Sequence, residues 1–376
     1  DAYFEAMSGI TTTGATVITG LDKLPGSINL WRCFLQWLGG MGILVLAVAI
    51  LPMLGGGGGQ LFRAEATGPM TDTKLTPRIT ETAKGLWTVY CLLSVACLLA
   101  YRWGGMTWMD AWAHMFTTLS LGGLSTHDAS FGFFNSPTLE WIAIVFMLLA
   151  SCNFALYFVA FVKRQPLKVL RDPEWRASIG LLVGVSLLIA ALLWFKGHSA
   201  DLADIIRMSL FNVISIGSTT GYATVDYTQW PVFAPIVMLI LSGIATSAGS
   251  TGAGIKMSRL VILLKQARRE MRAIIHPRAV QPVTLAGHPV DNRTIFSVLG
   301  FMLMYGGTII VLTLLLLLTD MPFETAFSAV VASVNNMGPG LNEVGPAGNF
   351  QGLTDFQTWV CTLAMLLGRL EMLSFL

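Results

Sequence analysis

The sequence predicts an all-α integral membrane protein built from four related repeats around a common axis, and three observations support this fold class. First, 54% of the 376 residues are hydrophobic and only 12% are charged, whereas soluble domains carry about 25% charged residues. Second, several apolar stretches are long enough to cross a bilayer, which takes roughly 20 residues. Third, shorter apolar segments alternate with them, and each ends in a stretch rich in Gly, Ser, Thr or Asn.

These segments define one repeating unit: a span, a half-helix too short to cross the bilayer, a polar loop and a second span. The predicted spans are 30–54, 85–103, 138–162, 177–196, 231–264, 294–319 and 355–376. The predicted half-helices are 1–10, 108–119, 203–216 and 322–333. The pattern places repeat 1 at 1–54, repeat 2 at 85–163, repeat 3 at 177–264 and repeat 4 at 294–376, with connecting loops at 55–84, 164–176 and 265–293.

The first and last repeats lack part of this unit. The chain begins at Asp1 within a half-helix segment and stops at Leu376 inside an apolar run, so we expect a chain truncated at both ends. Repeats 1 and 2 otherwise share a pattern, since Asp1 stands thirteen residues before Gly14 and Asp110 stands thirteen before Gly123. Similarity of this kind across four copies of about 100 residues is difficult to obtain by chance.

The basic residues predict the orientation. Segments 55–84, 163–176 and 256–293 hold 17 of the 23 Lys and Arg residues, and such an excess marks the cytoplasmic side. The polar loops therefore open from the outer face, where acidic residues gather: Asp22, Asp110, Asp128, Asp201, Asp204, Asp226, Glu324 and Glu343. An acidic mouth concentrates cations, but a plain depletion of bases outside gives the same distribution, and both interpretations stay open.

The polar loops have the composition of a cation-selective filter. A half-helix that ends at mid-membrane directs the partial negative charge of its last carbonyls toward the centre, and a ring of carbonyls replaces the hydration shell of a monovalent cation. Glycines permit the backbone angles that this requires. The alternative is a set of simple turns between helices. The predicted filter residues are Thr12, Thr13, Gly14, Leu121, Gly122, Gly123, Thr219, Thr220, Gly221, Asn336, Met337 and Gly338.

A second unusual stretch interrupts the apolar run 231–264. Small and hydroxyl residues at membrane depth favour a break in the helix, and a loop beneath the third polar loop would form a movable plug in the pore. The alternative is a close helix contact of the small-xxx-small type. The predicted gating residues in this loop, 243–254, are Gly243, Ala245, Thr246, Ser247, Gly249, Ser250, Thr251, Gly252 and Gly254.

Arg369 lies inside the last predicted span, where an arginine is costly and marks a functional position by default. It is expected to pair with Glu371 or with the glycine-rich loop, or to place a positive charge in the pore as a barrier to cations. Arg32 and Arg207 lie near segment ends, where a long side chain reaches the interface by snorkelling.

Other chemistries find little support. The five cysteines lie scattered in apolar runs without disulfide or metal spacing, and the five histidines have no neighbouring carboxylate pattern. No GxxxxGK[ST] or GxGxxG loop occurs, so no nucleotide cofactor is expected in this chain. A membrane-embedded hydrolase would need a Ser/His or paired-Asp constellation, which Ser250 lacks. We expect no enzyme and no nucleic-acid partner.

Several motifs resemble the bacterial Trk/Ktr/HKT potassium transporter superfamily: Thr11–Thr16, Gly217–Thr224, Asn336–Gly340 and Gly368–Glu371. The segment Gln60–Pro69 narrows the resemblance to the TrkH subfamily. The resemblance implies four M1–pore helix–M2 repeats with four-fold pseudo-symmetry around a central cation pore, and a homodimer with one pore per protomer. It also implies filter glycines at Gly14, Gly123, Gly221 and Gly338, a gating loop at Gly243–Gly254, and a pore-facing arginine at Arg369.

By the same resemblance, the protein takes up K⁺ across the bacterial inner membrane through this filter. The gate would be controlled by a TrkA-like cytoplasmic subunit that binds the nucleotide and docks on the basic loops. One departure is Leu124, where an aromatic residue is common. The alternative is a proton- or sodium-coupled potassium symporter, for which Glu371 is the one intramembrane acid to test.

Overall fold

The computed structural model describes residues 1–49, 79–162, 167–197, 201–276, 281–285 and 288–371. Helices dominate these residues, and their one paired sheet is a hairpin of β1 (Thr284–Leu285) and β2 (His288–Pro289). The loop motif at 60–69 and most of the predicted loop 55–84 lie outside the described residues. The all-α prediction is confirmed.

All four predicted half-helices are present as short helices. Their observed bounds are α1 (Ala2–Ile10), α5 (Trp108–Leu119), α10 (Leu202–Gly217) and α14 (Phe323–Val334). Polar side chains begin two of them, because the Thr107 hydroxyl accepts the Asp110 N–H and the Asp201 carboxylate accepts the Ala203 N–H. A 3₁₀ turn follows each polar loop: η1 (Leu21–Lys23), η2 (Ser130–Phe134), η3 (Tyr227–Gln229) and η4 (Asn342–Val344).

Other helices surround these half-helices. They are α2 (Gly26–Ala49), α4 (Ile79–Trp103), α6 (Pro137–Ala150), α7 (Phe154–Val162), α8 (Leu167–Arg171), α9 (Pro173–Phe195), α11 (Phe233–Ile244), α12 (Met257–Ile275), α13 (Asn292–Leu317) and α15 (Asp355–Arg369). In the described part, Ala83–Trp103, α9 and α13 are each long and apolar enough to cross a membrane, and the bent pair α6–α7 is a fourth candidate if the two helices are counted as one span. At most 39% of the apolar window of each single helix is buried, which leaves broad outer faces for lipid.

The predicted span 138–162 is present as two helices rather than one. It bends by 89° between α6 and α7. The Asn153 side chain accepts the Ala155 N–H (2.8 Å), and the Ser151 hydroxyl donates to the Leu148 carbonyl (2.9 Å). Both side chains compete with the helical hydrogen bonds of the backbone, and hydropathy alone does not reveal this effect.

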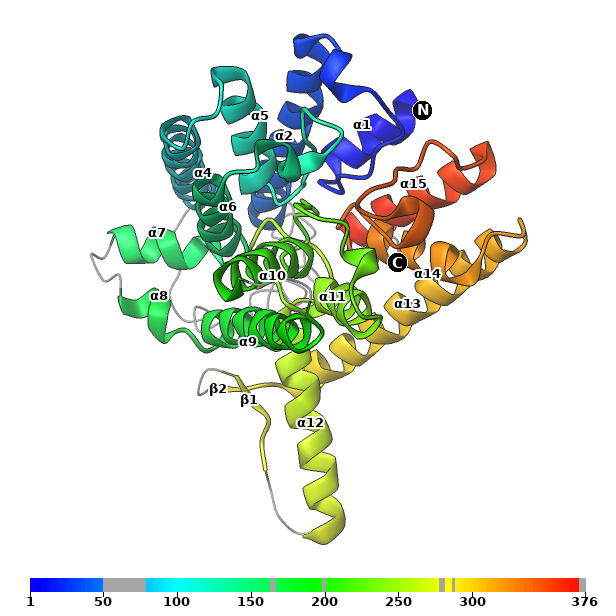
Figure 1. Ribbon diagram of the computed structural model, residues 1–376. Helices are drawn as coiled ribbons and strands as arrows, with labels where there is room; N and C mark the ends of the chain where they lie inside the picture. Colours follow the sequence, from blue (N-terminus) through cyan, green and yellow to red (C-terminus); the bar gives the residue numbers. More distant parts are fainter. Residues whose placement is uncertain (50–78, 163–166, 198–200, 277–280, 286–287, 372–376) are drawn as a thin grey trace.

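The fourth repeat packs against the first, so the repeats close into a ring. Figure 1 shows α1 beside α15, while α12 projects away from the bundle. The Tyr3 and Trp359 rings lie 5.1 Å apart across this junction. The arrangement agrees with four repeats around a common axis.

Arg32 does not snorkel to the membrane interface, which corrects the expectation from its position in the sequence. Its side chain is buried rather than directed to the interface, and its Nε donates to Glu5 of α1 (2.7 Å). The Glu5 carboxylate also accepts the Val17 N–H (3.2 Å). The ion pair therefore fixes α2 and the first polar loop to α1. Sequence position near a helix end gave no sign of this partner.

We predict that Glu5→Gln destabilises the protein by about 3–5 kcal/mol, because it leaves the Arg32 charge buried and unpaired. Thermal unfolding in detergent measures the effect. Glu5→Gln combined with Arg32→Met should recover much of the loss, since no charge then remains buried. Glu343→Gln, at an exposed position, is the control and should change stability by less than about 0.5 kcal/mol. Equal losses in the single and double variants would contradict the prediction.

Candidate functional site

The four half-helices end in one and the same backbone motif. In each, the residue after the C-cap adopts a positive φ: 55° at Thr12, 54° at Leu121, 64° at Thr219 and 49° at Asn336. The next N–H then donates to a carbonyl five residues back, at 2.8–2.9 Å: Thr13 to Ser8, Gly122 to Thr117, Thr220 to Ser215 and Met337 to Ala332. This is the Schellman motif, here formed without glycine at the left-handed position. The four loops thus start in the same direction relative to their helices.

The glycines that follow bring the four loops together. Gly14, Gly123, Gly221 and Gly338 have φ values of 85°, 70°, 87° and 94°, which side chains disfavour. A Cβ on Gly14 would overlap the Gly122 oxygen, one on Gly123 the Thr220 oxygen, and one on Gly221 the Met337 oxygen; a Cβ on Gly338 would lie 2.9 Å from the Thr13 oxygen. Each of these glycines therefore contacts a carbonyl oxygen of the next loop, and that carbonyl belongs to the residue just before the next loop's own glycine. The four contacts close a ring.

This ring brings together the predicted residues of all four loops. Its members come from four separate positions of the chain, and only backbone fits between them. Carbonyl oxygens in such a ring can replace the water shell of a monovalent cation. Sequence reasoning missed Gln36, whose Nε2 donates to the Gly122 oxygen (2.7 Å) and whose Oε1 accepts the Leu124 N–H (3.2 Å). Gln36 thus holds the second loop from α2.

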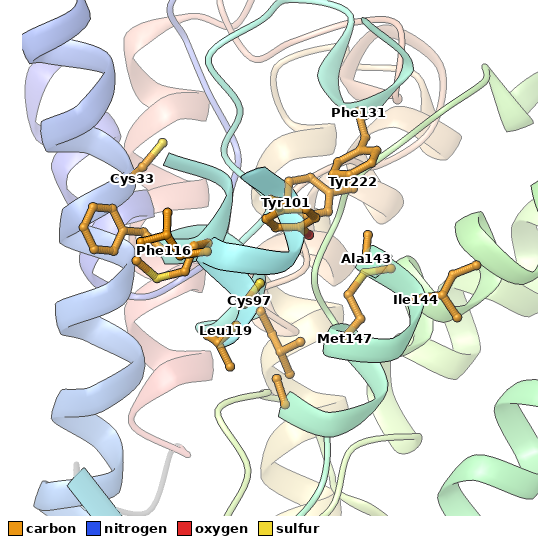
Figure 2. Close-up of a cluster of buried hydrophobic side chains, with 14 of the residues drawn as sticks. Cys33, Cys97, Tyr101, Phe116, Leu119, Phe131, Ala143, Ile144, Met147 and Tyr222 are labelled. Atoms are coloured by element: carbon orange, nitrogen blue, oxygen red, sulfur yellow. The ribbon is translucent and has the colours of Figure 1, made fainter. Parts of the chain in front are cut away.

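Buried polar contacts support the third and fourth loops. The Tyr222 hydroxyl contacts the hydroxyls of Thr117 and Thr118 on α5, and its ring packs 5.2 Å from that of Phe131 (Figure 2). Asn336 Nδ2 donates to the Thr13 hydroxyl (2.9 Å), which links the fourth loop to the first. These contacts cross between repeats, so they fix the loops relative to one another.

The apolar run 231–264 is broken, as predicted, by a loop between α11 and α12. Gly243 and Ile244 belong to the end of α11, so the irregular segment is 245–256, hereafter the intramembrane loop. Its two ends meet, because the Ile255 N–H donates to the Gly243 oxygen (2.6 Å). The rest of the loop contacts the half-helix ends: the Thr251 hydroxyl donates to the Leu119 oxygen (3.0 Å), and the Ala253 N–H donates to Thr219 Oγ1 (3.4 Å). The loop therefore lies directly against the second and third polar loops.

Arg369 binds this loop. At 7% exposure its guanidinium is buried, and it donates to the Thr251 oxygen (3.0 Å) and to the Gly39 oxygen of α2 (3.2 Å). The alternative pairing with Glu371 is not the one observed, since Glu371 bonds to Lys256 (2.7 Å) and Arg259 (2.6 Å). The arginine thus connects the first and last repeats to the intramembrane loop.

A cavity opens above the ring. Its empty space is about 560 Å³, open solvent included, and its lining contains all four ring glycines together with Arg32 and other side chains. His127 on this lining bonds to Asp22 of the first repeat (2.5 Å). That hydrogen bond is the main reason that the pKa of Asp22 is lowered. Sequence reasoning missed Asp22 as the partner of His127, because the two residues lie 105 positions apart.

Buried acids are the main omission of the sequence reasoning, which singled out Glu371. Five others are less than 10% exposed: Glu5, Asp110, Glu140, Asp172 and Glu174. Each has partners in place. Glu5 pairs with Arg32 and Glu140 with Arg207, Asp110 bonds to the hydroxyls of Thr107 and Thr126, Asp172 accepts the Trp175 N–H, and Glu174 accepts the N–H groups of Ala248 and Ser258. All five stand near helix N-termini, where an acid is ordinary, so their sequence positions alone do not reveal that they are buried.

The family model described as TrkH, a cation transport protein, matches residues 1–376. The chain belongs to the TrkH family. Its relatives include the Trk system potassium uptake protein TrkH of Vibrio parahaemolyticus, which is 47% identical over all of this chain and 78% of the relative. TrkH of Escherichia coli K12 is 45% identical, over 77% of its length, and TrkG of the same strain is 40% identical, over 76%.

The fold agrees with this family. The crystal structure of the potassium transporter TrkH from Vibrio parahaemolyticus superposes with a TM-score of 0.90 at 44% identity, covering all of this chain and 77% of that one. The relatives are named as transporters and not as enzymes. The apolar helices and the family together make the chain a multi-pass protein of the bacterial inner membrane.

We predict that Gly123→Ala costs more stability than Gly20→Ala. Both glycines have a φ of 70°, so both substitutions carry the same backbone strain of about 1–2 kcal/mol. Only at Gly123 does the added Cβ meet a carbonyl, whereas nothing lies within 4 Å at Gly20. The overlap should add about 1–3 kcal/mol in thermal unfolding measurements. Equal losses at both sites would argue against the close approach of the loops.

Proposed function

We propose that the chain forms the ion pathway of a potassium uptake system, with K⁺ passing through a filter made of Thr12–Gly14, Leu121–Gly123, Thr219–Gly221 and Asn336–Gly338. The observation that carries this proposal is the closed ring of four glycine loops at the ends of four half-helices. The relatives named as Trk system potassium uptake proteins support K⁺ as the transported ion.

The electrostatics favour a cation without a charged ligand. Four half-helix C-termini surround one ring, and each carries a partial negative charge. Among the described residues, Asn336 Oδ1 is a buried acceptor without a hydrogen-bond partner, and such an oxygen gains from a nearby cation. Because the four loops differ in sequence, the filter should be less stringent than one made of four identical loops.

The intramembrane loop is the proposed gate. It lies against the ends of α5 and α10 and is held by Arg369, so it obstructs the path beneath the ring until it moves. Its small and hydroxyl residues give a backbone that can rearrange without moving large side chains. Arg369 in this proposal braces the closed loop and adds a positive charge below the filter.

Partners complete the system. The name "Trk system" of the relatives fits a multi-component assembly. We infer a TrkA-like cytoplasmic subunit that binds the nucleotide and docks on the basic loops, and a homodimer with one pore in each protomer. Lipid covers exposed apolar side chains of α13 such as Leu303, Phe296 and Ile310. The chain itself needs no cofactor for this role.

Coupled symport with protons or sodium is the alternative. It would need acids that exchange ions along the path. The buried acids in the described part are instead held by arginine, hydroxyl or backbone partners. We therefore favour the channel-like pathway.

We predict that Gly221→Ser weakens potassium discrimination, because a Cβ there would overlap the Met337 oxygen and displace the fourth loop. Rubidium and sodium fluxes into liposomes that hold the complete gene product measure this. The rubidium-to-sodium ratio should fall roughly tenfold, which corresponds to about 1.4 kcal/mol.

Gly20→Ser is the matched control, since Gly20 also has a positive φ but no neighbour within 4 Å. It should keep the parent ratio. An unchanged ratio in Gly221→Ser would refute the filter assignment. If neither the parent nor Gly221→Ser gives flux, the regulatory subunit is added. Selective flux in the parent would then indicate a gate that had been closed, and continued absence of flux would refute the assignment.

We also predict that shortening 245–253 raises the basal rubidium flux, because a shorter loop cannot reach the ends of α5 and α10. The ratio of rubidium to sodium flux should remain at the parent value, which serves as the internal control that the filter is intact. Parent-level flux in the folded variant would count against the gate.

A further inference from the structure

Glu174 is a buried acid that the ion pathway does not use. It lies in the first turn of α9, and its side chain bonds to the intramembrane loop and α12. Oε1 accepts the N–H of Ala248 (2.8 Å) and the N–H of Ser258 (3.2 Å). These two donors stand on either side of the glycine-rich part of the intramembrane loop, so a single carboxylate binds both of its flanks.

The contact with Ser258 also supplies a missing helix cap. The N-cap of α12 is Lys256, which has a φ of 71° and makes no side-chain hydrogen bond to the helix start. The first N–H groups of a helix need an acceptor when they are buried, and a negative charge there interacts favourably with the helix dipole. Glu174 provides both from another helix, and loss of its carboxylate leaves the start of α12 without this acceptor.

The segment from Ser151 to Glu174 contacts the intramembrane loop near both of its ends, and Glu174 makes the second contact. At the other end, the bend between α6 and α7 binds the same loop: the Ser247 N–H donates to the Ser151 oxygen (3.1 Å), and the Phe154 N–H donates to the Gly249 oxygen (3.1 Å). Between these contacts the chain passes through α8, in the segment that the basic residues place at the cytoplasmic side. The bend and Glu174 therefore hold the same stretch of the loop, residues 247–249, from the two ends of this segment.

We propose that Glu174 is a positioning residue that latches the intramembrane loop in its closed position and couples it to the cytoplasmic start of α9. The inference rests on the proposed function, in which this loop is the gate. Release of the carboxylate frees Ala248 and Ser258 together, so both flanks of the loop loosen in one step. The loop then withdraws from the ends of α5 and α10, and the pathway opens without any change at the filter.

The test is rubidium and sodium flux into liposomes that hold the complete gene product with Glu174→Ala. We expect basal rubidium flux to rise roughly tenfold, because hydrogen bonds to a charged group shift a two-state equilibrium by about this factor. The rubidium-to-sodium ratio should stay at the parent value. Glu174→Gln keeps an acceptor oxygen but loses the charge, so it should give a smaller rise and so restore most of the parental closure.

Asp172→Ala is the matched control. Asp172 is a buried acid two residues earlier, and it caps α9 by accepting the Trp175 N–H (2.9 Å). Its loss should lower the melting temperature and leave basal flux at the parent value. A flux increase in Asp172→Ala equal to that in Glu174→Ala would mean that general loosening of α9 opens the path, and would overturn the proposal.

A double variant tests whether Glu174 acts through the loop. Glu174→Ala on top of the shortened 245–253 loop should add no flux, since the shortened loop no longer reaches the ends of α5 and α10 and the path is already open. A full tenfold increase in that background would overturn the proposal. Parent-level flux in Glu174→Ala, beside high selective flux in the shortened-loop variant, would overturn the latch and leave the proposed function intact. An absence of selective flux in every form, with the regulatory subunit added, would overturn both.

Discussion

The close approach of four backbones at one ring is the constraint on which the rest of the structure depends. Each ring glycine leaves only enough space for the next loop's carbonyl oxygen, so a single methyl group on any of them meets an oxygen atom. Irregular backbone at membrane depth is tolerated only inside protein or beside a water-filled cavity. The half-helices, the surrounding spans and the contact between α1 and α15 together supply that enclosure.

The intramembrane loop is also irregular backbone at membrane depth, and its polar groups are satisfied in a different way. Its backbone is irregular and buried, and its hydrogen-bond partners come from three repeats: Leu119 and Ser151, Thr219, and Arg369. Arg369 in turn bonds to Gly39 of the first repeat. Side chains and carbonyls of other elements thus satisfy the polar groups that a helix would satisfy internally. A segment held only by such distributed contacts can move as one unit when a few of them are released, which suits a gate.

Local composition was sufficient to predict the half-helices and the loops. The predicted segment 108–119 coincides with α5, and the loop in 231–264 is present, because hydropathy and glycine content act over a few residues. Interactions between distant residues were beyond this reasoning. Glu5 and Arg32 are 27 residues apart, Glu174 and Ser258 are 84 apart, and His127 and Asp22 are 105 apart. These contacts follow from the assembly of the repeats, which no single segment encodes.

The four loops share a backbone but not their side chains. Thr12, Leu121, Thr219 and Asn336 adopt the same left-handed conformation, yet Asn336 bonds to the first loop, whereas Thr219 accepts from the intramembrane loop. Gln36 holds only the second loop. The four-fold pseudo-symmetry therefore applies to the backbone that forms the carbonyl ring and not to the side-chain contacts around it. Unequal side chains let the Thr219 hydroxyl of the third loop bond to the intramembrane loop, the proposed gate, while Asn336 and Gln36 hold the other loops to their neighbours.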